Sequence, residues 1–332
     1  MNRRPALLPW IALVTVYFVW GSTYLGIRVA VATIPPFLMA GSRYLTAGLL
    51  LMGLQWLISK EKPSLPGRDL LLRIAASAVL LIVIGNGILC LAETRVEAGT
   101  AALLVTSTPI WMLLFSALRA RKLPGWTAIA GVVLGSAGMV VLIGKHTAHA
   151  DALFAGLILV GSASWALGSI YARDREHHPL TAALEMTIGG AGLTLAGLLV
   201  GEAGRLDVHA VTAQSWWGWL WLLTGGAMLG YTAYAYTLRT LPTATVSTYA
   251  YVNPAVAVFL GWAFVGEHVG GKEIAAGLVI LASVGLLLFS RHPEPDAEPT
   301  AESLLPYIQG KDAQSKRFRS APRLAELRRI SS

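Results

Sequence analysis

The stretch STYAYVNPAVAVFLGWAF, residues 247–264, places a proline, Pro254, inside an otherwise apolar run. A second apolar stretch, TAALLVTSTPIWMLLFSAL at residues 100–118, carries Pro109 in the same setting. A proline inside a helix leaves a carbonyl without its hydrogen bond, and a bilayer tolerates this only where the carbonyl is buried in protein or faces water. We therefore expect Pro109 and Pro254 to kink two membrane helices beside one central cavity. The alternative is that both prolines only bend packed helices.

The composition is that of a membrane protein. Of 332 residues, 55% are hydrophobic and 13% are charged, whereas about 25% of the residues of soluble domains are charged. Ten apolar stretches approach the roughly 20 residues that cross a bilayer as a helix. They are residues 8–30, 36–58, 71–92, 98–118, 125–143, 153–172, 180–200, 216–238, 243–265 and 273–290. The sequence therefore predicts an all-α membrane protein with ten spans.

One offset of 145 residues relates distant parts of the chain. The related pairs are Pro109 with Pro254, Trp20 with Trp165, and Asn86 with Tyr231. Self-similarity at this length predicts two structural repeats of five spans each, at residues 8–143 and 152–290. Because five is odd, the second repeat enters the bilayer from the opposite side, so the two five-helix repeats are inverted.

The basic residues predict the orientation in the membrane. If the N-terminus is cytoplasmic, the cytoplasmic loops and ends hold twenty Lys and Arg residues, and the outer loops hold four. Cytoplasmic loops carry the excess of positive charge in membrane proteins, so both termini are expected in the cytoplasm. This distribution also accounts for the net charge of +8 without a nucleic-acid partner.

The segment from residue 291 to residue 332 differs in composition from the rest. It opens with RHPEPDAEP, a proline-rich polar run without apolar periodicity, which is typical of a disordered cytoplasmic tail. From Lys311 onward it holds seven Lys or Arg residues. This basic part is expected either to contact anionic lipid or to remain a solvated tail without a partner.

Helix-breaking residues at corresponding places of two inverted halves predict a substrate site at the interface between the repeats. Polar and aromatic side chains near both prolines and near the repeated tryptophans are the expected lining. They are Trp20, Asn86, Thr108, Trp165, Tyr231, Tyr234, Tyr249, Tyr251 and Asn253. Each aromatic residue also has an alternative interpretation as part of the packed core or of the membrane interface.

Four motifs in the two halves carry a resemblance to a known family. They are VWGSTYLGIRVA at 19–30, MAGSRYLTAG at 39–48, VIGNGILCLAE at 83–93 and ATVSTYAYVNPAVAVFLGWAFVGE at 244–267. With them the chain resembles the EamA family of the drug/metabolite transporter superfamily, and within it the inner-membrane permeases of bacteria. The resemblance implies ten helices, cytoplasmic termini and a central path for a small-molecule substrate.

Ionisable side chains within spans are costly to insert, so each is a functional hypothesis. Arg43 lies in the second span and Glu93 ends the third. Arg43 is expected to pair with Glu93, to extend toward the outer interface, or to act in gating and in binding anionic groups.

Glu185 lies in the seventh span, and aligning SRYLTAG with LEMTIGG makes it the repeat equivalent of Arg43. A buried carboxylate takes up a proton readily unless a cation stays beside it. Glu93 has Arg43 and Arg95 as expected neighbours, whereas Glu185 has no basic residue in its own span. We therefore predict Glu185 as the proton carrier, with a packing role for Glu185 and facilitated diffusion as the alternatives.

The sequence favours a secondary transporter that exports small organic metabolites, such as amino acids or drug-like compounds, by alternating access. An intramembrane enzyme is disfavoured, because every histidine and aspartate lies outside the predicted spans. A loop of the kind that cradles ATP phosphates is missing, and Cys90 is the single cysteine, so neither a cofactor nor a metal is expected. A receptor or scaffold without transport remains an alternative, and the sequence leaves the oligomeric state open.

Overall fold

The computed structural model describes residues 7–59, 63–96, 98–143, 151–173, 178–260 and 271–289. Within these ranges the chain is helical and contains no β-strand. The expectations for the segment 291–332 lie outside the described residues, as do Lys60, Lys62 and the end of the ninth predicted span.

The first five predicted spans all coincide with helices. The bounds are α1 Leu7–Ala30, α2 Pro36–Ile58, α3 Arg68–Ala78 continued by η1 Val79–Asn86 and α4 Gly87–Ala92, α5 Ala98–Val105 followed by α6 Thr108–Ala120, and α7 Trp126–Ile143. As helices, these apolar segments satisfy their backbone hydrogen bonds internally, as a bilayer requires.

The other five spans are helical as well. The bounds are α8 Ala152–Arg173, α9 Thr181–Leu199, α10 Ala213–Trp221 continued by η4 Leu222–Tyr231 and α11 Thr232–Thr240, α12 Thr243–Ser247 followed by α13 Tyr249–Leu260, and α14 Gly271–Phe289. Two short turns, η2 Glu202–Arg205 and η3 Val208–Ala210, connect α9 to α10. Six of the described helical segments are long and apolar enough to cross a membrane, and α7 and α14 are shorter apolar helices. The expectation of an all-α membrane fold is confirmed.

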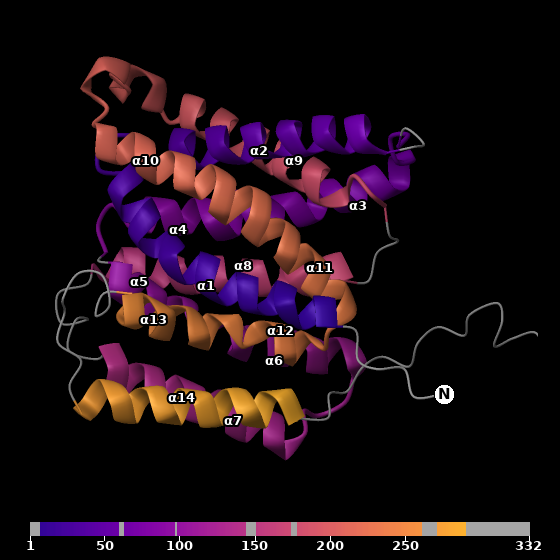
Figure 1. Ribbon diagram of the computed structural model, residues 1–332, viewed down its shortest axis with the longest axis vertical. Coiled ribbons are helices and arrows are strands. Elements are labelled where there is room, and N and C mark those ends of the chain that lie inside the picture. Colours follow the sequence, from indigo (N-terminus) through magenta and orange to yellow (C-terminus); the bar gives the residue numbers. More distant parts are fainter. Residues whose placement is uncertain are drawn as a thin grey trace, which may run out of the picture. The chain divides into compact units, whose positions relative to one another are not determined.

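The helices pack as two related halves. Helix α2 lies along α9, and α7 lies along α14, so each of these pairs joins equivalent helices of the two repeats. Figure 1 shows the two pairs at opposite edges of the helical body, with α1 and α8 between them. Other large helix–helix contacts also occur in pairs that the repeat relates. The contact of α1 with η4 corresponds to that of α8 with η1, and the contact of α1 with α13 corresponds to that of α8 with α6.

The close approach of α2 and α9 shows the inversion at the level of single residues. A Cβ atom added at Gly48 would lie 2.5 Å from the backbone nitrogen of Thr187. One added at Gly190 would lie 2.7 Å from the Cα atom of Leu45. The alignment of SRYLTAG with LEMTIGG pairs Gly48 with Gly190 and Leu45 with Thr187. The two helices therefore make the same contact from either side, as inverted repeats require.

Small residues also bring α7 against α14. A Cβ atom at Gly135 would lie 2.5 Å from the Ser283 hydroxyl, and one at Gly138 would lie 3.0 Å from the side chain of Ile280. Small residues let membrane helices approach closely. In the structure these glycines serve packing within the chain.

Both halves interrupt a helix near the predicted prolines, but in different ways. Pro109 lies in the first turn of α6, after the break that follows α5. The carbonyl of Val105, which Pro109 deprives of an amide partner, accepts a hydrogen bond from Thr108 Oγ1 at 2.7 Å. Pro254 lies inside α13. Pro109 therefore lies in the first turn of a helix, where its missing N–H would have no partner within the helix in any case. Thr108 satisfies the carbonyl that Pro109 leaves free.

Each repeat also contains a π-helical segment. Shifting Val79–Asn86 of η1 by 145 residues gives 224–231, which lies within η4. In a π-helix some carbonyls are left for other donors, and such segments occur often at functional sites. The indole of Trp20 donates to the carbonyl of Gly226 in η4 at 3.1 Å, and Ser164 donates to Leu80 in η1 at 2.8 Å. The two π-segments are thus anchored by the helices that cross them, α1 and α8.

Candidate functional site

A cavity lies between the two halves, beside both helix breaks and both π-segments. Six of the nine predicted substrate-binding residues line it: Trp20, Asn86, Thr108, Trp165, Tyr249 and Asn253. Arg43, predicted for coupling or gating, lines it as well. The cavity therefore brings together residues that the 145-residue offset relates, such as Trp20 with Trp165.

The rings of Trp20, Trp165 and Tyr249 form one wall of the cavity, and Tyr234, which does not line it, packs against them. The ring centroid of Trp20 lies 5.5 Å from that of Trp165, 4.8 Å from that of Tyr234 and 5.3 Å from that of Tyr249. The indole nitrogen of Trp165 donates to the Tyr234 hydroxyl at 3.0 Å. Edge-on and tilted contacts of this kind stabilise a cluster beyond its buried area. The wall is consequently apolar but held in place by hydrogen bonds at its edges.

Arg43 provides the positive charge of the cavity. Its Nη2 atom donates to Asn86 Oδ1 at 2.7 Å, and its guanidinium carbon lies 4.4 Å from the centroid of the Tyr44 ring. The side chain is 2% exposed, and its Nε atom has no hydrogen-bond partner among the described residues. Arginine is well suited to forked hydrogen bonds with carboxylates and phosphates. The site thus holds a fixed cation whose Nε–H group has no acceptor among the described residues.

Thr108 and Asn253, which the repeat offset makes equivalent, satisfy the backbone at the edge of the cavity. Thr108 donates to Val105 as described above. The amide of Asn253, with its nitrogen turned toward two carbonyls, donates to Tyr17 O at 3.1 Å and to Tyr249 O at 3.0 Å. Buried backbone groups need such partners. Both residues therefore line the site and keep its backbone hydrogen-bonded.

Three predicted binding residues lie elsewhere. Tyr251 packs toward α7, where its hydroxyl donates to the Val132 carbonyl at 3.2 Å. It follows Tyr249 by two residues, which is about 200° around a helix, so the two rings face opposite ways. Tyr231 and Tyr234 line a second cavity instead. We correct the predicted lining accordingly.

The second cavity is the repeat equivalent of the first. It is lined by Leu81, Ala172, Glu185, Tyr231, Tyr234, Ala235, Leu238 and Arg239. Under the repeat alignments the first five correspond to Gly226, Ile27, Arg43, Asn86 and Leu89, and all five of these line the first cavity. The empty space is about 670 Å³ in the first cavity and about 240 Å³ in the second. The two halves thus hold equivalent cavities of different size.

The surroundings of Glu185 differ from those expected. Glu185 accepts a hydrogen bond from Ser77 Oγ at 2.6 Å and shares the second cavity with Arg239 of α11. The sequence alone shows only which basic residues share the span of Glu185. A cation from another helix therefore weakens the case for Glu185 as the proton carrier.

Glu93 also departs from its predicted setting. It is 0% exposed, and neither carboxylate oxygen accepts a hydrogen bond from any described residue. Arg43 donates to Asn86 instead. Arg28 Nη1 donates at 2.7 Å to the main-chain carbonyl of Glu93, not to its side chain, and Arg95 is exposed. Among the described residues, the predicted direct ion pair of Arg43 with Glu93 is therefore not formed.

Several site residues were missed from the sequence. Tyr24 and Ser162 both line the cavity, and the Ser162 hydroxyl is buried without a partner in the described part of the chain. Tyr24 follows Trp20 by four residues, so the two lie on one face of α1. This helical spacing was the signal that identifies Tyr24, whereas the sequence gives no comparable signal for Ser162.

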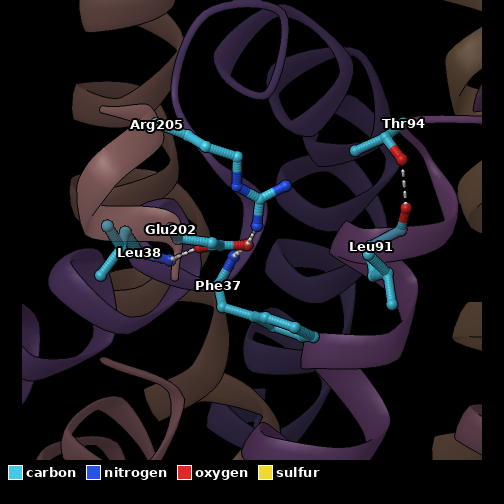
Figure 2. A network of polar contacts seen from close by, with 6 residues as sticks. All are labelled: Phe37, Leu38, Leu91, Thr94, Glu202 and Arg205. Atoms are coloured by element: carbon cyan, nitrogen blue, oxygen red, sulfur yellow. Dashed lines mark hydrogen bonds and ion pairs between the residues drawn. The ribbon is translucent and has the colours of Figure 1, made fainter. Parts of the chain in front are cut away.

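Glu202 was also missed, and it anchors the helix that carries Arg43. Figure 2 shows its carboxylate at the start of α2, where Leu38 N donates to Oε2 at 2.8 Å and Phe37 N donates to Oε1 at 3.3 Å. Arg205 lies 3.9 Å from the same carboxylate. The first amides of a helix lack partners within it and favour negative charge. Glu202 thus caps α2 from the connection that follows α9.

Comparison with known proteins agrees with this architecture. The model of the EamA-like transporter family matches residues 8–144 and residues 153–289. Over 308 residues the chain is 37% identical to the "Uncharacterized inner membrane transporter YedA" of Escherichia coli strain K12, with 88% of this chain and 96% of that protein covered.

More distant relatives cover similar lengths. The chain is 24% identical over 304 residues to the "Probable amino-acid metabolite efflux pump" of Salmonella typhimurium strain LT2, covering 87% of this chain and 96% of that one. A solved crystal structure with 17% identity has a TM-score of 0.67 over 85% of this chain and 96% of its own, which shows the shared fold. Because the family model matches most of the chain, this protein belongs to the EamA-like transporter family.

Proposed function

We propose that this chain is a secondary transporter that moves small organic molecules across the bacterial inner membrane by alternating access. The observation that carries the proposal is the pair of repeat-equivalent cavities, one large and one small. Two inverted halves can exchange conformations, so that the small cavity opens when the large one closes. The intramembrane enzyme considered from the sequence is excluded by membership of a transporter family.

In this proposal the large cavity opens toward the outer face. Ile27 and Leu89 line it, and both lie near the outer ends of their spans if the termini are cytoplasmic. Toward the opposite face, the hydroxyls of Tyr17 and Thr248 share a hydrogen bond of 2.5 Å. This contact joins α1 to the break before α13 and is suited to closing the cytoplasmic side.

The lining favours a ligand with an anionic group and a flat apolar body. The Arg43 guanidinium is suited to a carboxylate, and Ser162 supplies a further buried hydroxyl. The rings of Trp20, Trp165 and Tyr249 offer apolar faces with polar edges. Aromatic amino acids and drug-like aromatic acids combine both features, so they are the substrate classes that we propose.

The names of relatives support the location and the direction. The relative from Escherichia coli is named an inner membrane transporter, and that from Salmonella typhimurium is named an efflux pump. We extend both to this chain as proposals: residence in the inner membrane with cytoplasmic termini, and export. A receptor or scaffold would bind a ligand without moving it.

The test combines binding with flux on the purified full chain. We would screen amino acids and aromatic carboxylates for thermal stabilisation, since a ligand that binds only the folded state raises stability. A stabilising compound would then be loaded into proteoliposomes and its flux measured. We expect flux above that of protein-free liposomes, and we expect Arg43→Gln to lose both stabilisation and flux. Arg205→Gln is the matched control, since Arg205 is 63% exposed and is not among the lining residues. Binding without any flux would contradict transport.

A further inference from the structure

Glu93 is a buried carboxyl group that the proposed transport cycle leaves unexplained. It follows α4 directly, beyond Leu89 of the cavity wall and Cys90. Its side chain is 0% exposed, and both carboxylate oxygens lack a hydrogen-bond donor among the described residues. Most buried polar atoms have a partner, so two unpartnered oxygens on one acidic group call for an explanation.

The charged and titratable groups around Glu93 come from three helices. They are Tyr24 and Arg28 on α1, Arg43 on α2, and Cys90 on α4. Of the other helices that pack here, α5 has no titratable side chain, and α8 carries Tyr171 and Arg173 only at its far end. Among the residues that the structure describes, Arg28 and Arg43 are thus the two cations that act on Glu93.

Both cations donate hydrogen bonds to acceptors other than the Glu93 carboxylate. Arg28 donates to the main-chain carbonyl of Glu93 at 2.7 Å, and Arg43 donates to Asn86 at 2.7 Å. Removing an ionised carboxylate from water is expensive unless hydrogen bonds replace the water. The arrangement therefore suits a neutral, protonated Glu93. An ionised Glu93 would require Arg28 or Arg43 to move toward it.

We propose that Glu93 binds and releases the proton that couples to transport. The proposal rests on the proposed function, and it replaces Glu185 as the proton carrier. The step is the reversible conversion of a carboxylate and a proton into a carboxylic acid, with no other bond changed. A protonated Glu93 leaves the Arg43 charge to an anionic ligand. An ionised Glu93 competes with that ligand for Arg43.

The test measures protonation directly and needs no substrate. Infrared difference spectra between acidic and alkaline pH would be recorded on the full chain in liposomes, where a protonated carboxyl group gives its own carbonyl band. We expect wild type to show a buried carboxyl band that titrates with pH. We expect Glu93→Gln to lose it, and Glu185→Gln and Glu202→Gln, the matched controls at two other buried glutamates, to keep it.

Each result decides the matter. Loss of the band in Glu93→Gln alone supports the proposal. A band that persists in Glu93→Gln, a band lost only in Glu185→Gln, or no titrating band in wild type would overturn it. Should Glu93→Gln fail to fold, Glu93→Asp serves instead, and a band that keeps its wild-type frequency in that variant would also overturn the proposal. Because the measurement uses no ligand, it can succeed even if the flux assay fails.

Discussion

At the scale of single residues, the buried carboxylates divide by the partners they have. Glu202 receives two backbone amides and lies near Arg205. Glu185 receives the Ser77 hydroxyl. Glu93 receives no hydrogen bond from the described residues. Hydrogen bonds stabilise the charged form of a carboxylate. Glu202 therefore suits a helix cap and Glu185 a polar contact in the small cavity, and we propose Glu93 as the proton site.

The cap formed by Glu202 can be tested by stability. We expect Glu202→Ala to lower the free energy of unfolding by about 1.5–3 kcal/mol, the range for hydrogen bonds to charged groups. Arg205→Ala should change it by less than about 1 kcal/mol, because the Arg205 side chain is 63% exposed and exposed ion pairs contribute little. The measurement is denaturation of both variants in detergent. Equal losses would show that the ion pair, not the cap, anchors α2.

The sequence could identify a site residue only where it also indicated which side of its helix faces the cavity. Type and spacing indicated Trp20, Trp165 and Tyr249, because the repeat offset and the nearby prolines marked them. Tyr251 was misplaced because residue type alone does not tell which side of α13 faces the cavity. Helical spacing from Tyr249 would have separated the two.

At the scale of elements, the close approach of α2 and α9 holds the two halves together. We expect Gly190→Ala to destabilise the protein by about 1–3 kcal/mol, because its Cβ would overlap the backbone of Leu45. Gly53→Ala in α2 is the control, since nothing lies within 4 Å of that Cβ. Thermal denaturation in detergent would compare them. Equal stability of the two variants would show that the contact between α2 and α9 is loose.

The spans followed from apolar length, but their internal irregularities did not. The sequence indicated kinks at Pro109 and Pro254, whereas the structure has a break before Pro109 and another before Tyr249. The π-segments η1 and η4 contain no proline, so no residue type in the sequence indicates where they lie. Their positions depend on side chains of crossing helices, such as the indole of Trp20 on the Gly226 carbonyl. Tertiary contacts of that kind cannot be read from local sequence.

At the scale of the whole molecule, the odd number of spans in each repeat makes the two halves face opposite sides. The topology can be checked with reporter fusions. We expect fusions after residues 122 and 291 to report a cytoplasmic location, and fusions near residues 145 and 205 to report the outer side, because cytoplasmic loops retain the excess of basic residues. Reversal at any of these positions would contradict the proposed orientation.

The most direct test of the account compares cysteines at repeat-equivalent positions, one in each cavity. In a Cys90→Ala background, Ile27→Cys would line the large cavity and Ala172→Cys would line the small one. A membrane-impermeant thiol reagent would be added from outside intact cells. We expect it to label Ile27→Cys and to leave Ala172→Cys unlabelled. Labelling of Ala172→Cys from outside, or of neither cysteine, would contradict a repeat interface whose large cavity opens outward.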